Sequence, residues 1–295
     1  MLEAIAALIP KLDTPIDIPN HDEFSINPVF AMTTVINSII TACDPQKPVL
    51  MFDESDVLTN FSDNNEAIKN ILNFMRSLVE NNREVFFIFA SCRDIRWIEN
   101  PHLSHLLTLF YEPIKVDLLK KTATISLILD PVKDFFTYSE DALINIMKLS
   151  GCHPCFTQLI CRQAVDWRNH AKVNVVPTQA INAIIKNSIE RGHSQFVDLC
   201  KELSHDEMAI LYSLSYVLKE GEKATKDEIL KQLKVFKLKI VNWNMALDRL
   251  MHAELIYADG DYFYLRIGIL KYWIYRTPKN MLFQYLIRKN GGNAN

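Results

Sequence analysis

The first half of the chain carries two short, continuous apolar runs, each of which ends in polar side chains. Residues 49–52 are followed directly by the acid pair Asp53–Glu54, and residues 85–90 by the polar segment Ser91–Arg93. Continuous apolar runs of this length are typical of strands that are buried on both faces of a parallel sheet. Because ligands bind beyond the carboxyl ends of such strands, the two polar segments are the first candidates for chemistry.

Helical periodicity surrounds these two runs. Residues 65–80 place apolar side chains on one helix face between the runs, and Val29–Ile40 form a similar stripe upstream. Downstream, Ile114–Leu118 alternates apolar and polar residues, which predicts an edge strand. The order of elements is therefore strand, acid pair, helix, strand and polar end.

The second half of the chain reads as helices followed by a different pattern. Residues 121–200 are predicted to be all helical, with Gly151 as a C-terminal cap and Pro154 in the first turn of the next helix. Residues 203–276 have the order of a winged helix, with a capping box at Thr225–Glu228 and a hairpin signal at Asp259–Gly260. Residues 269–289 predict one further helix.

This order resembles the second half of a P-loop ATPase core of the AAA+/STAND type. Asp53–Glu54 matches the Walker B motif, and Ser91–Arg93 matches the sensor-1 position that follows it. The turn Ser150–Pro154 is similar to the Gly-x-Pro signature of the helical lid in STAND ATPases. The resemblance spans about residues 25–280, and these three places carry its specific motifs. It implies an α/β fold class: a partial P-loop NTPase core with a parallel sheet, then a helical lid and a winged-helix domain.

The resemblance also implies residue roles and a cofactor, ATP or ADP with Mg²⁺. In a complete relative, Asp53 would hold Mg²⁺ and Glu54 would position the attacking water. Arg93, next to Ser91 at the strand tip, would touch the γ-phosphate. The turn residues His153–Pro154 would rest against the base and sugar. The implied function is nucleotide-dependent switching in signalling or defence.

The phosphate-binding loop of this class is missing from the sequence. That loop needs glycines, so that backbone N–H groups can cradle phosphates, and a lysine. The chain has seven glycines, of which the first is Gly151, and it contains no Gly-Lys-Ser or Gly-Lys-Thr. The chain is therefore either a fragment of a longer product or a degenerate relative, and we do not expect it to hydrolyse ATP alone. The competing interpretation is a winged-helix regulator that binds DNA or protein without using nucleotide.

The resemblance divides the chain into a partial core, a lid, a winged helix and a tail, at residues 1–119, 120–202, 203–280 and 281–295. The core strands would leave an unpaired apolar edge, so we expect self-association or a partner protein to cover it. DNA binding is disfavoured, because the hairpin turn at Asp259–Gly260 carries aspartates and no basic residue, although lysines lie between Lys231 and Lys239.

Composition limits the remaining function classes. A net charge of −3 gives no general attraction to nucleic acid or acidic membranes. Six scattered cysteines suit a reducing compartment, and no long apolar run or signal peptide occurs, so we expect a cytoplasmic protein without a membrane span. The motif Cys152–Cys155 invites a redox or zinc interpretation, but it follows a helix and lacks convincing further ligands. We interpret it as buried thiols in a helical turn.

Overall fold

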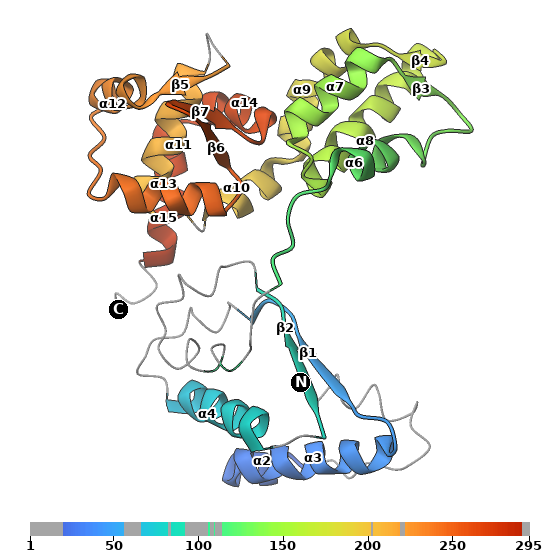
Figure 1. The fold of residues 1–295 in the computed structure, drawn as a ribbon, viewed down its shortest axis with the longest axis vertical. Coiled ribbons are helices and arrows are strands. Elements are labelled where there is room, and N and C mark those ends of the chain that lie inside the picture. The colour runs from blue at the N-terminus through green and yellow to red at the C-terminus, as the bar shows by residue number, and fades with distance from the viewer. Residues whose placement is uncertain are drawn as a thin grey trace. The chain divides into compact units, whose positions relative to one another are not determined.

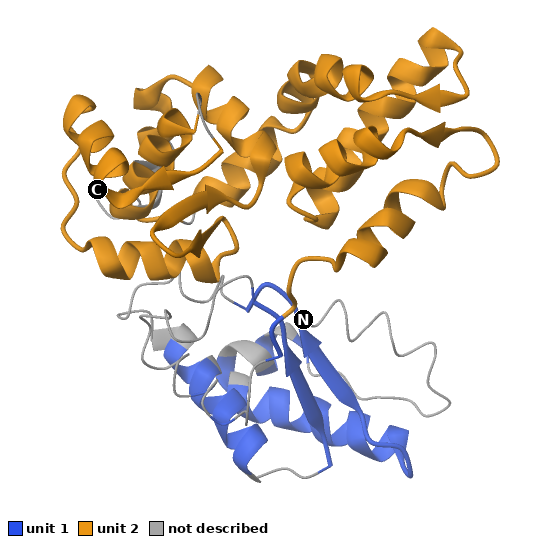
Figure 2. Cartoon of the chain, turned by 45° about the horizontal axis from the view of Figure 1, so that its top comes forward, with its two compact units in different colours: residues 1–115 blue, residues 116–295 orange. Residues whose placement is uncertain are grey.

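The computed structural model describes residues 20–55, 66–81, 84–91, 106, 109, 114–201, 203–218 and 222–290. The chain divides into two compact units, residues 1–115 and residues 116–295, which Figure 2 shows in different colours. Each unit is described here by itself. Among the described residues, no helix has the length and apolar character needed to cross a membrane.

Unit 1 is built on two parallel strands. Its elements are α2 (His21–Ile26), α3 (Pro28–Cys43), β1 (Val49–Phe52), α4 (Glu66–Asn81) and β2 (Phe86–Phe89) (Figure 1). The register pairs Val49 with Phe86 and Phe52 with Phe89. A parallel pair needs a long crossover connection, and α4 lies in that connection. The predicted helices and the predicted parallel strands are thus confirmed in this unit.

Local side-chain bonds set where the first helices begin. Asn20 accepts hydrogen bonds from the backbone N–H groups of Asp22 and Glu23, and the Glu23 carboxylate accepts one from the Asn20 N–H in return. This capping box satisfies donors that have no partner inside the helix. Asn27 then ends α2 and caps α3, whose first residue is Pro28. Proline suits that position because its missing N–H would be unpaired there anyway.

The prediction that both strands are buried on both faces is wrong. Phe52 and Phe89 stack with their ring centroids 5.0 Å apart, and they pack against Leu72 and Met75 of α4. The opposite face is exposed, with Met51 at 73%. Its four side chains are those of Val49, Met51, Phe86 and Ile88. Alternate side chains of a strand point to opposite faces, and the described helices pack against one of them.

The segment that was predicted to be an edge strand, Ile114–Leu118, has no regular structure. Ile114 and Val116 are each 92% exposed. Alternation fits a strand only where a neighbouring strand supplies hydrogen bonds and one face is packed. Neither condition holds for this segment, so the prediction is wrong.

Unit 2 begins with a helical region. Its elements are α6 (Lys121–Leu129), β3 (Thr137–Tyr138), α7 (Glu140–Ser150), α8 (Pro154–Ala171), β4 (Val175–Val176), α9 (Thr178–Arg191) and α10 (His193–Lys201). The predicted caps are confirmed: Gly151 ends α7 with a φ of 61°, and Pro154 opens α8. The prediction of an all-helical region missed the short strands β3 and β4, which pair in parallel.

The rest of unit 2 alternates helices and short strands. Its elements are α11 (His205–Val217), β5 (Ala224–Thr225), α12 (Lys226–Val235), α13 (Trp243–His252), β6 (Ile256–Asp259), β7 (Tyr262–Leu265), α14 (Gly268–Arg276) and α15 (Lys279–Asn290). Strand β7 pairs antiparallel with both β5 and β6. The predicted capping box at Thr225–Glu228 and the hairpin at Asp259–Gly260 are confirmed.

The prediction of a single helix over residues 269–289 is wrong, because the helix breaks at Thr277–Pro278. Thr277 is extended, with φ −92° and ψ 123°. Proline lacks a backbone N–H and disfavours the helical conformation of the residue before it. Helix α15 therefore starts anew at Lys279.

One hydrophobic core runs through the whole of unit 2. It joins Ile146 of α7 and Phe156 of α8 to Leu214 of α11 and Trp273 of α14. The rings of Phe156, Phe196 and Trp273 stack in sequence, with centroids 4.8 and 5.5 Å apart. The helical region and the region that contains the hairpin thus share a continuous interior.

Candidate functional site

The acid pair lies directly beyond the carboxyl end of strand β1. Asp53 and Glu54 follow Phe52, the last residue of the strand, and both are exposed. The Asp53 carboxylate accepts a hydrogen bond of 2.8 Å from the backbone N–H of Glu54. Glu54 has a φ of 50°, in the left-handed region that residues other than glycine seldom adopt. The chain therefore turns sharply at the acid pair and leaves both carboxylates accessible.

Ser55 fixes this turn to the end of strand β2. Its backbone N–H and its hydroxyl both donate to the carbonyl oxygen of Ala90, at 2.9 and 2.8 Å. The N–H of Ala90 in turn donates to the carbonyl oxygen of Phe52 at 2.8 Å. Ser55 is 4% exposed. These bonds bring the acid pair and Ser91, the next residue after Ala90, to the same edge of the sheet.

Sequence reasoning placed the acid pair correctly after a strand but missed Ser55. The available signal was a hydroxyl residue directly after the acids, because serine often bonds to nearby backbone in turns. Its actual partner, Ala90, is 35 residues away, and that distance hid the interaction. The predicted γ-phosphate residue, Arg93, lies outside the described residues.

This edge of the sheet has the chemistry for a hard cation. Carboxylate oxygens are the ligands that Mg²⁺ prefers, and Mg²⁺ is usually held by one or two carboxylates together with water and phosphate oxygens. In the described parts of the chain, no group of three or more histidine, cysteine, aspartate or glutamate side chains could hold a metal. Asp53 therefore fits a site in which most ligands come from water and a phosphorylated ligand.

The second candidate site is the turn between α7 and α8 in unit 2. Gly151 donates its N–H to the Met147 carbonyl at 2.9 Å, and His153 donates its N–H to the Ser150 carbonyl at 3.1 Å. The His153 ring lies 4.9 Å from the Phe156 ring. Burial lowers the pKa of His153, which favours the neutral imidazole. Its buried Nδ1 has no hydrogen-bond partner.

The cysteines of this turn do not have the environment of a redox pair. Burial raises the pKa of the Cys155 thiol, so the reactive thiolate is disfavoured. Cys152 occupies a left-handed conformation, with φ 60°, directly after Gly151. This geometry agrees with the interpretation of thiols in a helical turn.

Known structures decide the fold. The chain is similar to the Walker-type ATPase PABY2304 of Pyrococcus abyssi, with a TM-score of 0.60 and 12% identity over 93% of this chain and 76% of that chain. The chain has an AAA+ ATPase-like fold. The predicted α/β fold class, with a parallel-sheet core followed by helical regions, is therefore confirmed.

Two weaker likenesses accompany it. The Aeropyrum pernix ORC2 protein, solved in ADPNP–ADP complexes, gives a TM-score of 0.47 and 13% identity over 98% of this chain and 74% of that chain. Thermotoga maritima RuvB gives 0.41 and 14%, over 82% and 74%. No family model matches the chain, and no curated protein matches its sequence.

Proposed function

We propose that the chain is part of a nucleotide-dependent switch of the AAA+/STAND type, acting in cytoplasmic signalling or defence. The observation that carries this proposal is the acid pair Asp53–Glu54, which lies at the carboxyl end of a parallel strand and is joined through Ser55 to the next strand. In phosphoryl-transfer ATPases, acids at this edge work on the metal and the attacking water. The AAA+ ATPase-like fold supports the same assignment.

The proposed roles follow from the chemistry of each group. Asp53 holds Mg²⁺ together with phosphate oxygens, and Glu54 orients the attacking water. Ser91 and Arg93 face the γ-phosphate. The turn His153–Pro154 contacts the nucleoside, and a neutral imidazole suits contact with an uncharged base.

The C-terminal part of unit 2 is proposed to be a winged helix. Three helices, α11, α12 and α13, are followed by the β6–β7 hairpin, and β5 completes a three-stranded antiparallel sheet. In this proposal the helical region α6–α10 is the lid. The shared core of unit 2 would make lid and winged helix respond to nucleotide as one body.

We further propose that these 295 residues do not hydrolyse ATP by themselves. The sequence contains no Gly-Lys-Ser or Gly-Lys-Thr and no glycine before Gly151, so no backbone cradle of the usual kind is available for phosphates. Without that cradle we expect Mg·ATP to bind with a dissociation constant of about 1 mM or weaker, equivalent to roughly −4 kcal/mol. Phosphate release should equal that of the E54Q variant. Release that depends on Glu54 would show that the cradle is within these residues.

A millimolar interaction can still be mapped by NMR. Titration of Mg·ADP should shift the backbone amide signals of Glu54 and Ser91 in unit 1 and of His153 in unit 2. Removing Mg²⁺, or introducing D53N, should abolish the shifts in unit 1 and leave that of His153. D134N, at an exposed aspartate of unit 2, is the matched control. Shifts in unit 1 that are indifferent to both Mg²⁺ and D53N would reject the proposed metal role.

A further inference from the structure

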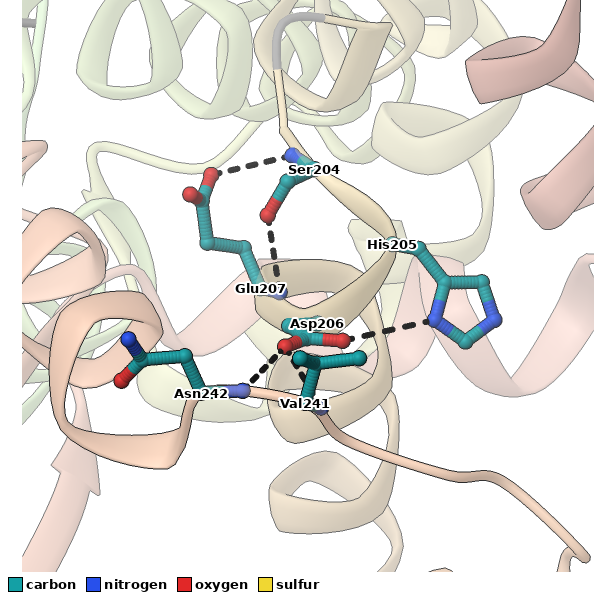
Figure 3. Close-up of polar contacts among 6 residues, drawn as sticks. All are labelled: Ser204, His205, Asp206, Glu207, Val241 and Asn242. Atoms are coloured by element: carbon teal, nitrogen blue, oxygen red, sulfur yellow. Dashed lines mark hydrogen bonds and ion pairs between the residues drawn. The ribbon is translucent and has the colours of Figure 1, made fainter.

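The turn that connects α12 to α13 is held in place by residues from other elements. One carboxylate oxygen of Asp206, in the first turn of α11, accepts hydrogen bonds from the N–H groups of Val241 and Asn242 at 2.9 and 2.8 Å (Figure 3). The ammonium group of Lys279 donates to the carbonyl oxygen of Phe236 at 2.6 Å. The backbone of the turn is thus fixed close to both of its ends.

Helix α13 is anchored to the same end of α11. Glu207 forms an ion pair of 3.5 Å with Arg249, and the Glu207 side chain is almost completely buried. Asn242 caps α13 by accepting a hydrogen bond from the Met245 N–H at 3.1 Å. The adjacent acids Asp206 and Glu207 therefore position both the turn and the helix that follows it.

This anchored turn displays positive charge and apolar surface together. Residues 231–239 include four lysines and no acidic residue. All four lysines are exposed, and none forms an ion pair with any described residue. Val235 is 65% exposed and Val241 is 96% exposed. We call these six residues the turn surface: Lys231, Lys234, Val235, Lys237, Lys239 and Val241.

The neighbouring elements have the opposite charge. Residues 241–265, which cover α13 and the β6–β7 hairpin, carry Asp248, Glu254, Asp259 and Asp261 against the single basic residue Arg249. Arg249 is already paired with Glu207. A duplex that followed α13 and the hairpin would bring its phosphates against these carboxylates. The positive charge is thus confined to the turn surface, a footprint that suits a short acidic segment better than a duplex.

We propose that the turn surface binds an acidic segment of a partner protein that also carries large apolar side chains. The lysines match its carboxylates, while the exposed valines give apolar side chains a place to be buried. Because the backbone of the turn is already fixed, binding costs little ordering entropy there. This proposal is independent of the nucleotide role of Asp53 and Glu54.

A peptide selection tests the inference on the full chain. A displayed library of random dodecapeptides is selected on the wild type, and the enriched peptides are synthesised and measured by fluorescence anisotropy. We expect enrichment of peptides that combine Asp or Glu with Leu, Ile or Phe. K231Q/K234Q/K237Q/K239Q and V235S/V241S should each weaken binding at least about tenfold. K121Q/K133Q, which changes two exposed lysines elsewhere in unit 2, should leave it unchanged.

The remaining outcomes would overturn the proposal. No enrichment of acidic and apolar peptides, or enriched peptides that bind all variants equally, would show that the turn surface is only a solvated face. A labelled 20-base-pair duplex provides the competing measurement. Tighter binding of the duplex than of the peptides, with loss in the lysine variant, would assign the surface to nucleic acid. Circular dichroism and thermal unfolding check that each variant is folded.

Discussion

At the scale of single residues, Asp206 shows how one carboxylate can organise a turn. It accepts two backbone N–H groups from a segment 35 and 36 residues away. We expect D206A to lower the free energy of unfolding by about 1–3 kcal/mol, because both donors lose their partner. Amide hydrogen exchange at Val241 and Asn242 should accelerate. D134A, at an exposed aspartate without a described partner, should change neither quantity, and equal effects of the two substitutions would contradict the role of Asp206.

A second residue-scale prediction concerns pH. Burial lowers the pKa of His153 in the folded state, so the unfolded chain takes up the proton first as the pH falls. The stability contributed by neutral His153 is complete above the unfolded pKa of about 6.5, and it is lost as the pH falls toward the folded value. Urea unfolding at pH 7.5 and 5.5 should show a larger loss for the wild type than for H153Q. An equal loss would mean that His153 titrates alike in both states.

At the scale of elements, two glycines allow the end of α7 to meet the start of α14. A Cβ atom added at Gly268 would lie 2.6 Å from the Lys148 carbonyl oxygen, and one at Gly151 would lie 2.3 Å from the Arg266 carbonyl oxygen. Both approaches are to backbone, which cannot move aside as a flexible side chain can. The proposed lid and winged helix are thus joined at the turn that carries His153.

Alanine at these positions should separate the two elements. We expect G268A to reduce the free energy of unfolding by about 1–3 kcal/mol through overpacking, and G151A to reduce it further because Gly151 also has a positive φ. G260A is the control, since Gly260 has a φ of 58° with nothing within 4 Å of the added Cβ. It should cost only the backbone term, about 1–2 kcal/mol. Urea unfolding followed by tryptophan fluorescence and far-UV circular dichroism measures all three. A loss in G268A no larger than in G260A would show that the contact tolerates a side chain.

The sequence predicted those elements whose signals are local. Gly151, Pro154 and the capping box at Thr225–Glu228 act within a few residues, and each fulfils its predicted role. Pro278 was an equally local signal, and overlooking it produced the error of a single C-terminal helix. The exposed face of the sheet was not predictable, because it depends on which elements pack there rather than on the strands themselves.

The candidate sites follow the same division. The position of the acid pair after a strand was readable from the abrupt change from apolar residues to carboxylates. The bonds from Ser55 to Ala90 and from Asp206 to Val241 were not readable, because they join residues that are 35 positions apart. The lowered pKa of His153 likewise results from tertiary burial. Local pattern therefore located the chemical groups, and long-range packing determined how they are held.

At the scale of the whole molecule, the exposed face of the two-stranded sheet bears on assembly. Val49 pairs with Phe86 and Met51 with Ile88, so the exposed apolar side chains form two adjacent rows. Contiguous exposed apolar surface of this kind marks an interaction site, and open parallel strands add unpaired backbone groups. We propose that a second copy of the chain covers this surface when no other partner is present.

This assembly should be visible by native mass spectrometry and sedimentation at micromolar concentration. The wild type is expected to form dimers or larger species whose population rises with concentration. M51K/I88K places a charge on each strand of the exposed face, and it should weaken association at least about tenfold, or 1.4 kcal/mol. Because both side chains are already exposed, the substitutions should leave the free energy of unfolding of the monomer within about 0.5 kcal/mol. The exposed lysine pair K121Q/K133Q controls for a general effect of surface charge. A wild type that stays monomeric throughout would mean that this face needs no second copy to remain soluble.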